Sequence, residues 1–313
     1  MKNIFLLCLI YLPFAASSQN QAVTPKPKLV VGIIIDQMRW DYLYRYADKY
    51  GPDGFKRLQK GYNCEHTHIP YVPTITGPGH TCAYTGSVPS IHGIIGNEWY
   101  DRESRSVVNC VGDTAYHTIG ATGREGKVSP NRLLTTTITD ELRMASNFRS
   151  KVIGIAAKDR GAILTAGHAA NAAYFFDGES GRWVSSSYYM DSLPGWAKDF
   201  NARKMPAKYV SNNWNTLLDI KQYTESTPDD EPYERAFKGE DKPAFPHMVA
   251  DAVARDPGAL IATPWGNTMT LDFGTGGDSR RAHGPGGVHR LSGYQLLLYR
   301  LCRTSVRPQL DRG

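Results

Sequence analysis

The stretch Leu29–Ile35, which reads LVVGIII and is followed at once by Asp36, decides the fold class of this 313-residue chain. A continuous β-branched run of this length is typical of a strand that is buried on both faces of a parallel sheet. A polar residue directly after such a strand lies at the carboxyl edge of an open α/β sheet, where ligands bind. The run therefore predicts an α/β fold with a mostly parallel central sheet and makes Asp36 a site candidate. The alternative role of Asp36 is an N-cap for a helix over residues 38–46.

Residues 73–81, PTITGPGHT, predict a helix that begins near Thr76 and stops at Gly86. Pro78 suits the first turn of a helix, where its missing N–H costs nothing. Free backbone N–H groups and the positive end of the helix dipole favour both an alkoxide and a bound phosphate at such a position. Thr76 is therefore a candidate nucleophile. A capping threonine is the simpler alternative.

A second buried run, residues 152–157, leads directly into Lys158 and Arg160. Two cations at the end of a strand can bind the oxygens of an anion, although a solvated turn is an equally simple explanation. Further along, residues 172–246 are rich in Tyr and Trp without a clear period. We interpret that segment as a loop-rich cap or insertion over the site.

The N-terminus has the pattern of a cleavable signal peptide over residues 1–18. Lys2 is followed by an apolar run over residues 4–16 and by small residues before Gln19, which is the order of such signals. The run is too short to span a bilayer. We therefore expect a periplasmic or secreted protein without a stable membrane span. Loss of Cys8 with the signal leaves four cysteines and no C-x-x-C pair, namely Cys64, Cys82, Cys110 and Cys302.

The net charge of +6 is concentrated at one end of the chain. Residues 274–313 contain seven arginines, two aspartates and no lysine, so the rest of the chain is close to neutral. A nucleic-acid-binding surface combines basic and aromatic residues on folded elements, and the body of the chain has no such pattern. We therefore expect no nucleic-acid partner.

Four motifs in chain order resemble the alkaline phosphatase superfamily. They are Asp36 after the first strand, TGPGH at 76–80, HGIIGN at 92–97 and KDRG at 158–161. The sequence is most similar to the threonine-nucleophile periplasmic bacterial alkaline phosphatases of the PafA type, which are related to nucleotide pyrophosphatase/phosphodiesterases. The resemblance extends from about Leu29 to Phe273 and implies an alkaline-phosphatase-like sandwich.

The resemblance also implies a reaction, namely zinc-dependent hydrolysis of small-molecule phosphate monoesters through a phosphothreonine intermediate. Thr76 matches the nucleophile and a metal ligand, and Asp36 matches another ligand of the two zinc ions of the intact enzyme. Asn97 matches an amide that donates to a phosphoryl oxygen. Lys158 and Arg160 match the groups that bind the remaining oxygens, and two cations suit a dianionic monoester. A hydroxyl needs such activation, because it is a poor nucleophile near neutral pH.

Related activities are distinguished by single residues. Sulfatases of the same superfamily have a Cys/Ser-x-Pro-x-Arg motif, and Thr76 and His80 stand at its first and last positions here, so a sulfatase is excluded. A phosphodiesterase or nucleotide pyrophosphatase remains the alternative. We interpret His80 as a structural residue.

Most of the family's zinc ligands have no counterpart in this sequence. Only Asp36 and Thr76 match; there is no Asp-x-x-x-His pair beyond Asn267 and no Asp-His dipeptide. A zinc ion usually has three or four protein ligands. The sequence therefore predicts a truncated, inactive form of a phosphomonoesterase whose fold is incomplete at the C-terminus. The alternative is a non-catalytic, phosphate-binding remnant.

A frameshift explains the end of the sequence. The motif match holds to Phe273, and residues 274–313 then contain eight glycines and seven arginines. A back-translation read one nucleotide later can encode an Asp-x-x-x-His pair across the codons for Tyr299 to Ser305. We therefore interpret residues 19–273 as the N-terminal part of the catalytic domain and residues 274–313 as an out-of-frame tail. A divergent, disordered basic tail is the alternative.

Overall fold

The structure is a computed structural model that describes residue 27 and residues 29–210, 213–276 and 295–301. Its strands are β1 (Leu29–Ile35), β2 (Glu98–Asp101), β3 (Ser106–Asn109), β4 (Thr118–Ile119), β5 (Lys151–Ala156), β6 (Ala172–Asp177), β7 (Arg182–Ser186) and β8 (Gln295–Leu301). Its α-helices are α1 (Tyr42–Arg45), α2 (Phe55–Leu58), α3 (Thr76–Thr85), α4 (Pro89–His92), α5 (Ile138–Ala145), α6 (Asp159–Ala166), α7 (Gly195–Ala202), α8 (Met205–Tyr209), α9 (Val249–Arg255) and α10 (Pro264–Gly274). Two 3-10 helices are η1 (Ile220–Gln222) and η2 (Pro257–Ala262).

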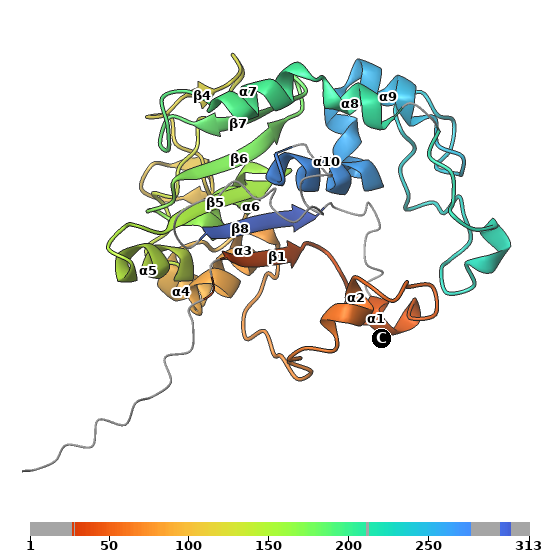
Figure 1. The fold of residues 1–313 in the computed structure, drawn as a ribbon, viewed down its shortest axis with the longest axis horizontal. Coiled ribbons are helices and arrows are strands. Elements are labelled where there is room, and N and C mark those ends of the chain that lie inside the picture. Colours follow the sequence, from red (N-terminus) through yellow and green to blue (C-terminus); the bar gives the residue numbers. More distant parts are fainter. Residues whose placement is uncertain (1–26, 28, 211–212, 277–294, 302–313) are drawn as a thin grey trace, which may run out of the picture.

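Six strands form the central sheet in the order β1-β8-β5-β6-β7-β4 (Figure 1). The pairs β1–β8, β8–β5 and β5–β6 are parallel, whereas β6–β7 and β7–β4 are antiparallel. The strands β2 and β3 form a separate antiparallel pair. The expected α/β fold with a mostly parallel central sheet is therefore confirmed.

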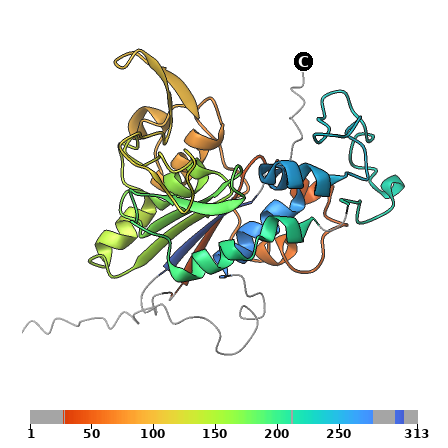
Figure 2. The same cartoon turned by 90° about the horizontal axis from the view of Figure 1, so that it is seen from above.

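Helices cover both faces of the inner part of the sheet (Figure 2). Strand β6 is buried along its whole length, and its successive side chains enter different cores, because side chains alternate across a strand. Tyr174 and Phe176 pack in one hydrophobic cluster with residues of α7, α9 and α10. Phe175 lies in a second cluster with residues of α6 on the other face. In the first core, Trp183 of β7 stacks on Phe273 of α10 with ring centroids 4.3 Å apart.

A cap over the site was expected at about residues 172–246, but the first part of this range belongs to the central sheet. Residues 172–186 form β6 and β7 of the central sheet, and α7 packs on this sheet through Ala197 and Phe200. The Tyr and Trp content was misleading, because β6 is buried on both faces and uses aromatic side chains to fill two cores. The next helix, α8, and the loops of 213–246 lie beside α9 and α10 in Figure 1.

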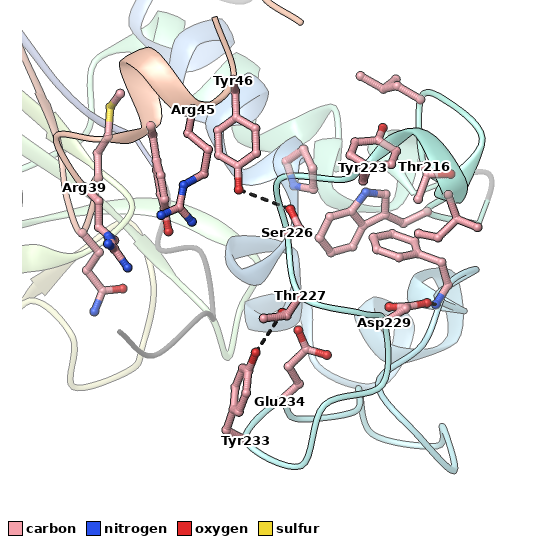
Figure 3. A pocket seen from close by; sticks show the side chains of 18 of the residues that line it. Arg39, Arg45, Tyr46, Thr216, Tyr223, Ser226, Thr227, Asp229, Tyr233 and Glu234 are labelled. Carbon is pink, nitrogen blue, oxygen red and sulfur yellow. Dashed lines mark hydrogen bonds between the residues drawn. The ribbon is translucent and has the colours of Figure 1, made fainter. Parts of the chain in front are cut away.

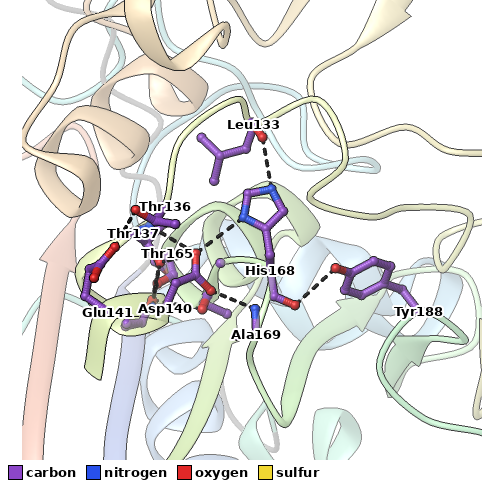
Figure 4. A network of polar contacts seen from close by, with 12 residues as sticks. Leu133, Thr136, Thr137, Asp140, Glu141, Thr165, His168, Ala169 and Tyr188 are labelled. Carbon is purple, nitrogen blue, oxygen red and sulfur yellow. Dashed lines mark hydrogen bonds and ion pairs between the residues drawn. The ribbon is translucent and has the colours of Figure 1, made fainter. Parts of the chain in front are cut away.

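A network of polar contacts ties α5 to the turn that follows α6 (Figure 4). Thr137 and Asp140 form a capping box at the start of α5. The Asp140 carboxylate also accepts a hydrogen bond from the backbone N–H of Ala169 at 2.7 Å and lies 3.3 Å from Nδ1 of His168. The other ring nitrogen of His168 is 2.9 Å from the carbonyl oxygen of Leu133. These contacts join two segments of the chain, one that precedes β5 and one that follows α6.

Several sequence-based expectations lie outside the described residues. The signal peptide expected at 1–18 is among them, as are residues 277–294 and 302–313 of the expected out-of-frame tail. The described part of that segment includes β8, a parallel strand between β1 and β5. Among the described residues no helix is long and apolar enough to cross a membrane. The three cysteines in the described part of the chain, Cys64, Cys82 and Cys110, are not in disulfides.

Candidate active site

Asp36 and Thr76 meet at the carboxyl edge of the sheet. Asp36 directly follows β1, and Thr76 is the first residue of α3. The Thr76 hydroxyl donates a hydrogen bond to Oδ2 of Asp36 at 3.1 Å. This contact joins residues that are 40 positions apart. Asp36 thus lies at the strand end and Thr76 at the helix start where the sequence predicted them.

The simpler roles considered for the two residues are not those seen in the structure. The N-cap of α3 is Ile75, which is extended (φ −92°, ψ 173°), so Thr76 lies one position inside the helix. The helix after β1 is shorter than expected, because α1 spans only Tyr42–Arg45 and has Asp41 as its N-cap. Thus Asp36 caps no helix there. Thr76 instead has its hydroxyl beside the Asp36 carboxylate at the start of α3.

Asn97 is held against the start of α3. Its Oδ1 accepts a hydrogen bond of 2.7 Å from the backbone N–H of Gly77, so the nitrogen of its amide faces away from this contact. The approach requires a glycine: a Cβ at position 77 would lie 2.8 Å from the carbonyl oxygen of Gly96 and 3.2 Å from Oδ1 of Asn97. The close packing of the two segments places an amide beside Thr76.

His80 lies on the same helix but is buried, with 3% of its surface exposed. Its Nδ1 is 2.9 Å from the carbonyl oxygen of Thr76. Because a carbonyl only accepts, Nδ1 is the donor in this contact. The placement agrees with the structural role predicted for His80, since the ring bonds to the backbone of the first turn of α3.

Lys158 and Arg160 lie at the same edge of the sheet but not in the same cleft as Thr76. Lys158 is the N-cap of α6 after β5, and Arg160 lies in its first turn. Burial raises the pKa of the Cys110 thiol to about 12, and the Arg160 guanidinium opposes this shift. Burial and neighbouring carboxylates raise the pKa of Glu125, and Lys158 opposes that shift. The Arg160 guanidinium thus lies near the Cys110 thiol, and the Lys158 ammonium lies near the Glu125 carboxylate.

A cleft of about 1530 Å³ is lined by Asp36, Thr76 and Asn97 and by residues of the segment 213–234. Two contacts join this segment to the chain after β1. The hydroxyl of Tyr46 is 3.2 Å from that of Ser226, and Lys49 forms an ion pair with Glu225. Figure 3 shows Ser226, Thr227 and Tyr233 on this wall of the cleft. Neither Lys158 nor Arg160 lines it.

Sequence reasoning missed most of the cleft lining. Arg39 and Arg45 line it and form ion pairs with Asp41 on their own segment. The far wall includes Trp214 and Tyr223. The only available signal was the high Tyr and Trp content of 172–246, which does not identify single residues.

The described residues do not by themselves form the expected zinc site. Asp36 and Thr76 offer a carboxylate and a hydroxyl, which are hard oxygen donors. Within the described ranges, however, no group of three or more His, Cys, Asp or Glu side chains could hold a metal ion. Zinc sites usually have three or four protein ligands.

A mostly parallel sheet with a carboxylate, a helix-terminal threonine and an amide gathered at its carboxyl edge agrees with the resemblance to the alkaline phosphatase superfamily. Within it, the chain belongs to the type I phosphodiesterase / nucleotide pyrophosphatase family, whose sequence profile matches residues 30–284.

Individual relatives agree with this assignment. The chain is 53% identical over 249 residues to alkaline phosphatase PhoV of Synechococcus elongatus, a match that covers 79% of this chain and 45% of PhoV. The crystal structure of wild-type alkaline phosphatase PafA superimposes with a TM-score of 0.83 at 46% identity, covering 89% of this chain and 53% of PafA. The chain thus spans about half the length of the relatives that it matches.

A second solved structure is a PafA variant, with a TM-score of 0.82 and 44% identity to this chain. In it one threonine is replaced by serine, and one asparagine, one lysine and one arginine are replaced by alanine. The threonine and the asparagine lie as many positions apart as Thr76 and Asn97 do here. The lysine and the arginine have the spacing of Lys158 and Arg160.

Proposed function

We propose that this chain carries the nucleophile of a phosphate monoester hydrolase of the alkaline phosphatase type, and that Thr76 is that nucleophile. The observation that carries the proposal is the Thr76 hydroxyl at the start of α3, bonded to the Asp36 carboxylate at 3.1 Å. The matching spacings within the two pairs of residues replaced in the PafA variant support the same assignment. The substrates would be small-molecule phosphate monoesters, and the protein would act in the periplasm or outside the cell.

In the first step, the Thr76 oxygen forms a bond to phosphorus as the bond from phosphorus to the leaving alkoxide breaks. The hydroxyl proton faces Asp36, which orients the hydroxyl and can accept the proton. The NH2 group of the Asn97 amide, whose Oδ1 is bonded to Gly77, would donate to a phosphoryl oxygen and stabilise its charge. Water then hydrolyses the phosphothreonine, which releases phosphate and restores the hydroxyl.

Zinc is part of the proposal only as a cofactor of the whole site. Asp36 and Thr76 would supply two of its oxygen ligands, and the others would come from outside the described residues. Because the sequence matches only these two of the family's ligand positions, and two donors are too few for a stable site, we expect the 313-residue chain alone to have little activity. A non-catalytic, phosphate-binding protein is the alternative that this shortage of ligands favours, and two zinc ions bound per chain would exclude that alternative.

A phosphodiesterase is the second candidate function, and the placement of Lys158 and Arg160 outside the cleft favours it. A monoester is a dianion and needs more positive charge beside the phosphate than a diester does. If Lys158 and Arg160 turn toward bound phosphate, replacing either by alanine should reduce monoester hydrolysis more than diester hydrolysis. The ratio of the two kcat/KM values measures this. Equal losses in the two kcat/KM values would show that Lys158 and Arg160 take no part in phosphate recognition.

The proposal is tested in a chimaera that joins residues 29–273 to the half of PhoV that this chain does not match. We expect Thr76→Ala to reduce the hydrolysis of an aryl phosphate on the order of 10³-fold or more, as removal of a nucleophile does. Thr85→Ala is the matched control, because Thr85 ends the same helix and its hydroxyl bonds only to its own segment. A Thr76→Ala chimaera with the parent rate would refute the assignment.

A further inference from the structure

His92 begins the motif HGIIGN that ends at Asn97, and it is 0% exposed. We call residues 92–97 the HGIIGN loop. Burial lowers the pKa of the His92 imidazole from its usual 6.5, so the ring is uncharged at neutral pH. A buried polar group costs free energy unless it is hydrogen-bonded. The partners of this ring therefore indicate what the histidine does.

Both ring nitrogens of His92 have partners, and the direction of each contact is defined. Nδ1 accepts a hydrogen bond of 3.1 Å from the backbone N–H of Ile94. A neutral imidazole then carries its proton on the other nitrogen, so Nε2 is the donor in its 3.2 Å contact with Sγ of Cys82. Cys82 lies on α3, the helix that begins with Thr76. The ring thus joins the HGIIGN loop to the helix that carries the candidate nucleophile.

A second bond joins the HGIIGN loop to the start of the same helix. Oδ1 of Asn97 accepts a hydrogen bond of 2.7 Å from the backbone N–H of Gly77. Gly77 is the second residue of α3, and the first N–H groups of a helix have no partner within it. One loop is therefore attached to one helix at two points. Two attachments fix both the distance and the direction of the loop, whereas a single bond would let the loop rotate.

The HGIIGN loop has little freedom between these two attachments. Ile94 is 0% exposed and packs in a hydrophobic cluster with Ala162 and Ile163 of α6. A Cβ at Gly96 would lie 2.9 Å from the carbonyl oxygen of Glu98, so the backbone is closely packed there as well. Because the loop cannot easily absorb a shift at one end, we expect a change at its first residue to move its last one.

We propose that His92 is a positioning residue for the candidate active site. Its bond to Cys82 holds the HGIIGN loop against α3. This attachment keeps the NH2 group of Asn97 directed toward the phosphoryl group that Thr76 attacks. The use of this amide in the reaction rests on the proposed function, whereas its placement by His92 does not.

The placement is tested in the 313-residue chain by hydrogen exchange at the backbone N–H of Gly77, followed by NMR. This N–H is bonded to Asn97, so its exchange rate reports whether the amide is in place. Cys82→Ala removes the acceptor of the Nε2 bond. His92→Asn keeps an acceptor close to its own backbone but is too short to reach Cys82. We expect either change to speed exchange at Gly77 about fivefold, the effect of one lost hydrogen bond.

Two further variants separate positioning from a general loosening of α3. Cys82→Ser offers a hydroxyl that can accept from Nε2, so it should restore the exchange rate of the parent chain. Thr85→Ala is the matched control, because Thr85 ends the same helix and its hydroxyl bonds only to its own segment. It should leave exchange at Gly77 unchanged.

The consequence for the reaction is tested in the chimaera of residues 29–273 with the unmatched half of PhoV. We expect Cys82→Ala to reduce kcat/KM for an aryl phosphate about tenfold, because a displaced donor stabilises the transition state less. In an Asn97→Ala background the same change should cause no further reduction, since residues that act through one contact are not additive. Cys82→Ser should again behave as the parent does.

Unchanged exchange at Gly77 in Cys82→Ala would overturn the proposal, and so would equally fast exchange in Thr85→Ala. Equal reductions of kcat/KM by Cys82→Ala with and without Asn97 would also overturn it. Cys82 is only partly buried, so its variants decide the matter even if His92→Asn fails to fold. If Asn97→Ala keeps the parent rate while exchange at Gly77 responds as expected, the proposed function fails and the placement of the amide by His92 stands.

Discussion

At the scale of single residues, the candidate site depends on a few close approaches. Asp36, Thr76 and Asn97 come from three separate segments, and two hydrogen bonds join them. Each bond involves the first turn of α3. The position of this turn therefore determines whether the hydroxyl, the carboxylate and the amide face the same cleft.

Gly77→Ala tests this positioning. A Cβ at position 77 would lie 2.8 Å from the backbone oxygen of Gly96, so one of the two segments has to move. We expect a loss of about 1 to 3 kcal/mol in the free energy of unfolding, the usual cost of overpacking. Chemical denaturation of the chain measures it. Gly51→Ala is the control, because nothing lies within 4 Å of its Cβ position, and equal effects of the two changes would show that the approach is unimportant.

The sequence predicted the positions of Asp36 and Thr76 in the fold better than the surroundings of the candidate site. Asp36 and Thr76 could be found because a strand end and a helix start have local signals in the sequence. The neighbours of Lys158 and Arg160 could not be predicted, because Glu125 and Cys110 are distant from them in sequence. The cleft wall from 213–234 was also beyond prediction, since it is held by contacts such as Tyr46 to Ser226, 180 positions apart.

At the scale of elements, the contact of Asp140 with His168 makes stability depend on pH. The Asp140 carboxylate favours the charged ring and raises the pKa of His168 above 6.5, although burial opposes this. Burial also acts to raise the pKa of Asp140, but hydrogen bonds from His168, Ala169 and Thr137 outweigh it and lower that pKa from 3.8 to about 2. Both shifts mean that the charged forms are favoured in the folded state.

The signs of the two shifts define the pH range of highest stability. The contribution of His168 is complete below its unfolded value of 6.5 and is lost as pH rises through the higher folded pKa. The contribution of Asp140 is complete above 3.8 and is lost as pH falls toward about 2. We expect urea midpoints to fall on both sides of the interval between these values. His168→Gln should remove the fall on the alkaline side, and an unchanged profile would contradict this account.

The sequence predicted β1, β5 and α3 correctly, because buried parallel strands and helix starts have clear local patterns. It failed at β6 and β7, which were assigned to a cap. Tyr174, Phe175 and Phe176 are all buried, so this strand lacks the alternation of polar and apolar residues that identifies a half-exposed strand. Aromatic content alone could not distinguish a doubly buried strand from an aromatic loop.

At the scale of the whole molecule, the protein has a well-packed centre and one uncovered side. Both hydrophobic cores lie around β5, β6 and β7, whereas the candidate nucleophile lies where the packed part meets the exposed segment 29–75. This chain positions Thr76, Asp36 and Asn97 at that boundary through two hydrogen bonds.

The measurement that tests the central claim most directly is the trapping of phosphate on Thr76. The chimaera of residues 29–273 with the unmatched half of PhoV is mixed with an aryl phosphate, quenched in acid within its turnover time, and digested for mass spectrometry. We predict one phosphoryl group on the peptide that contains α3, located at Thr76 and lost in Thr76→Ala but retained in Thr85→Ala. Turnover with a phosphoryl group on another residue, or with none on the protein, would contradict the account.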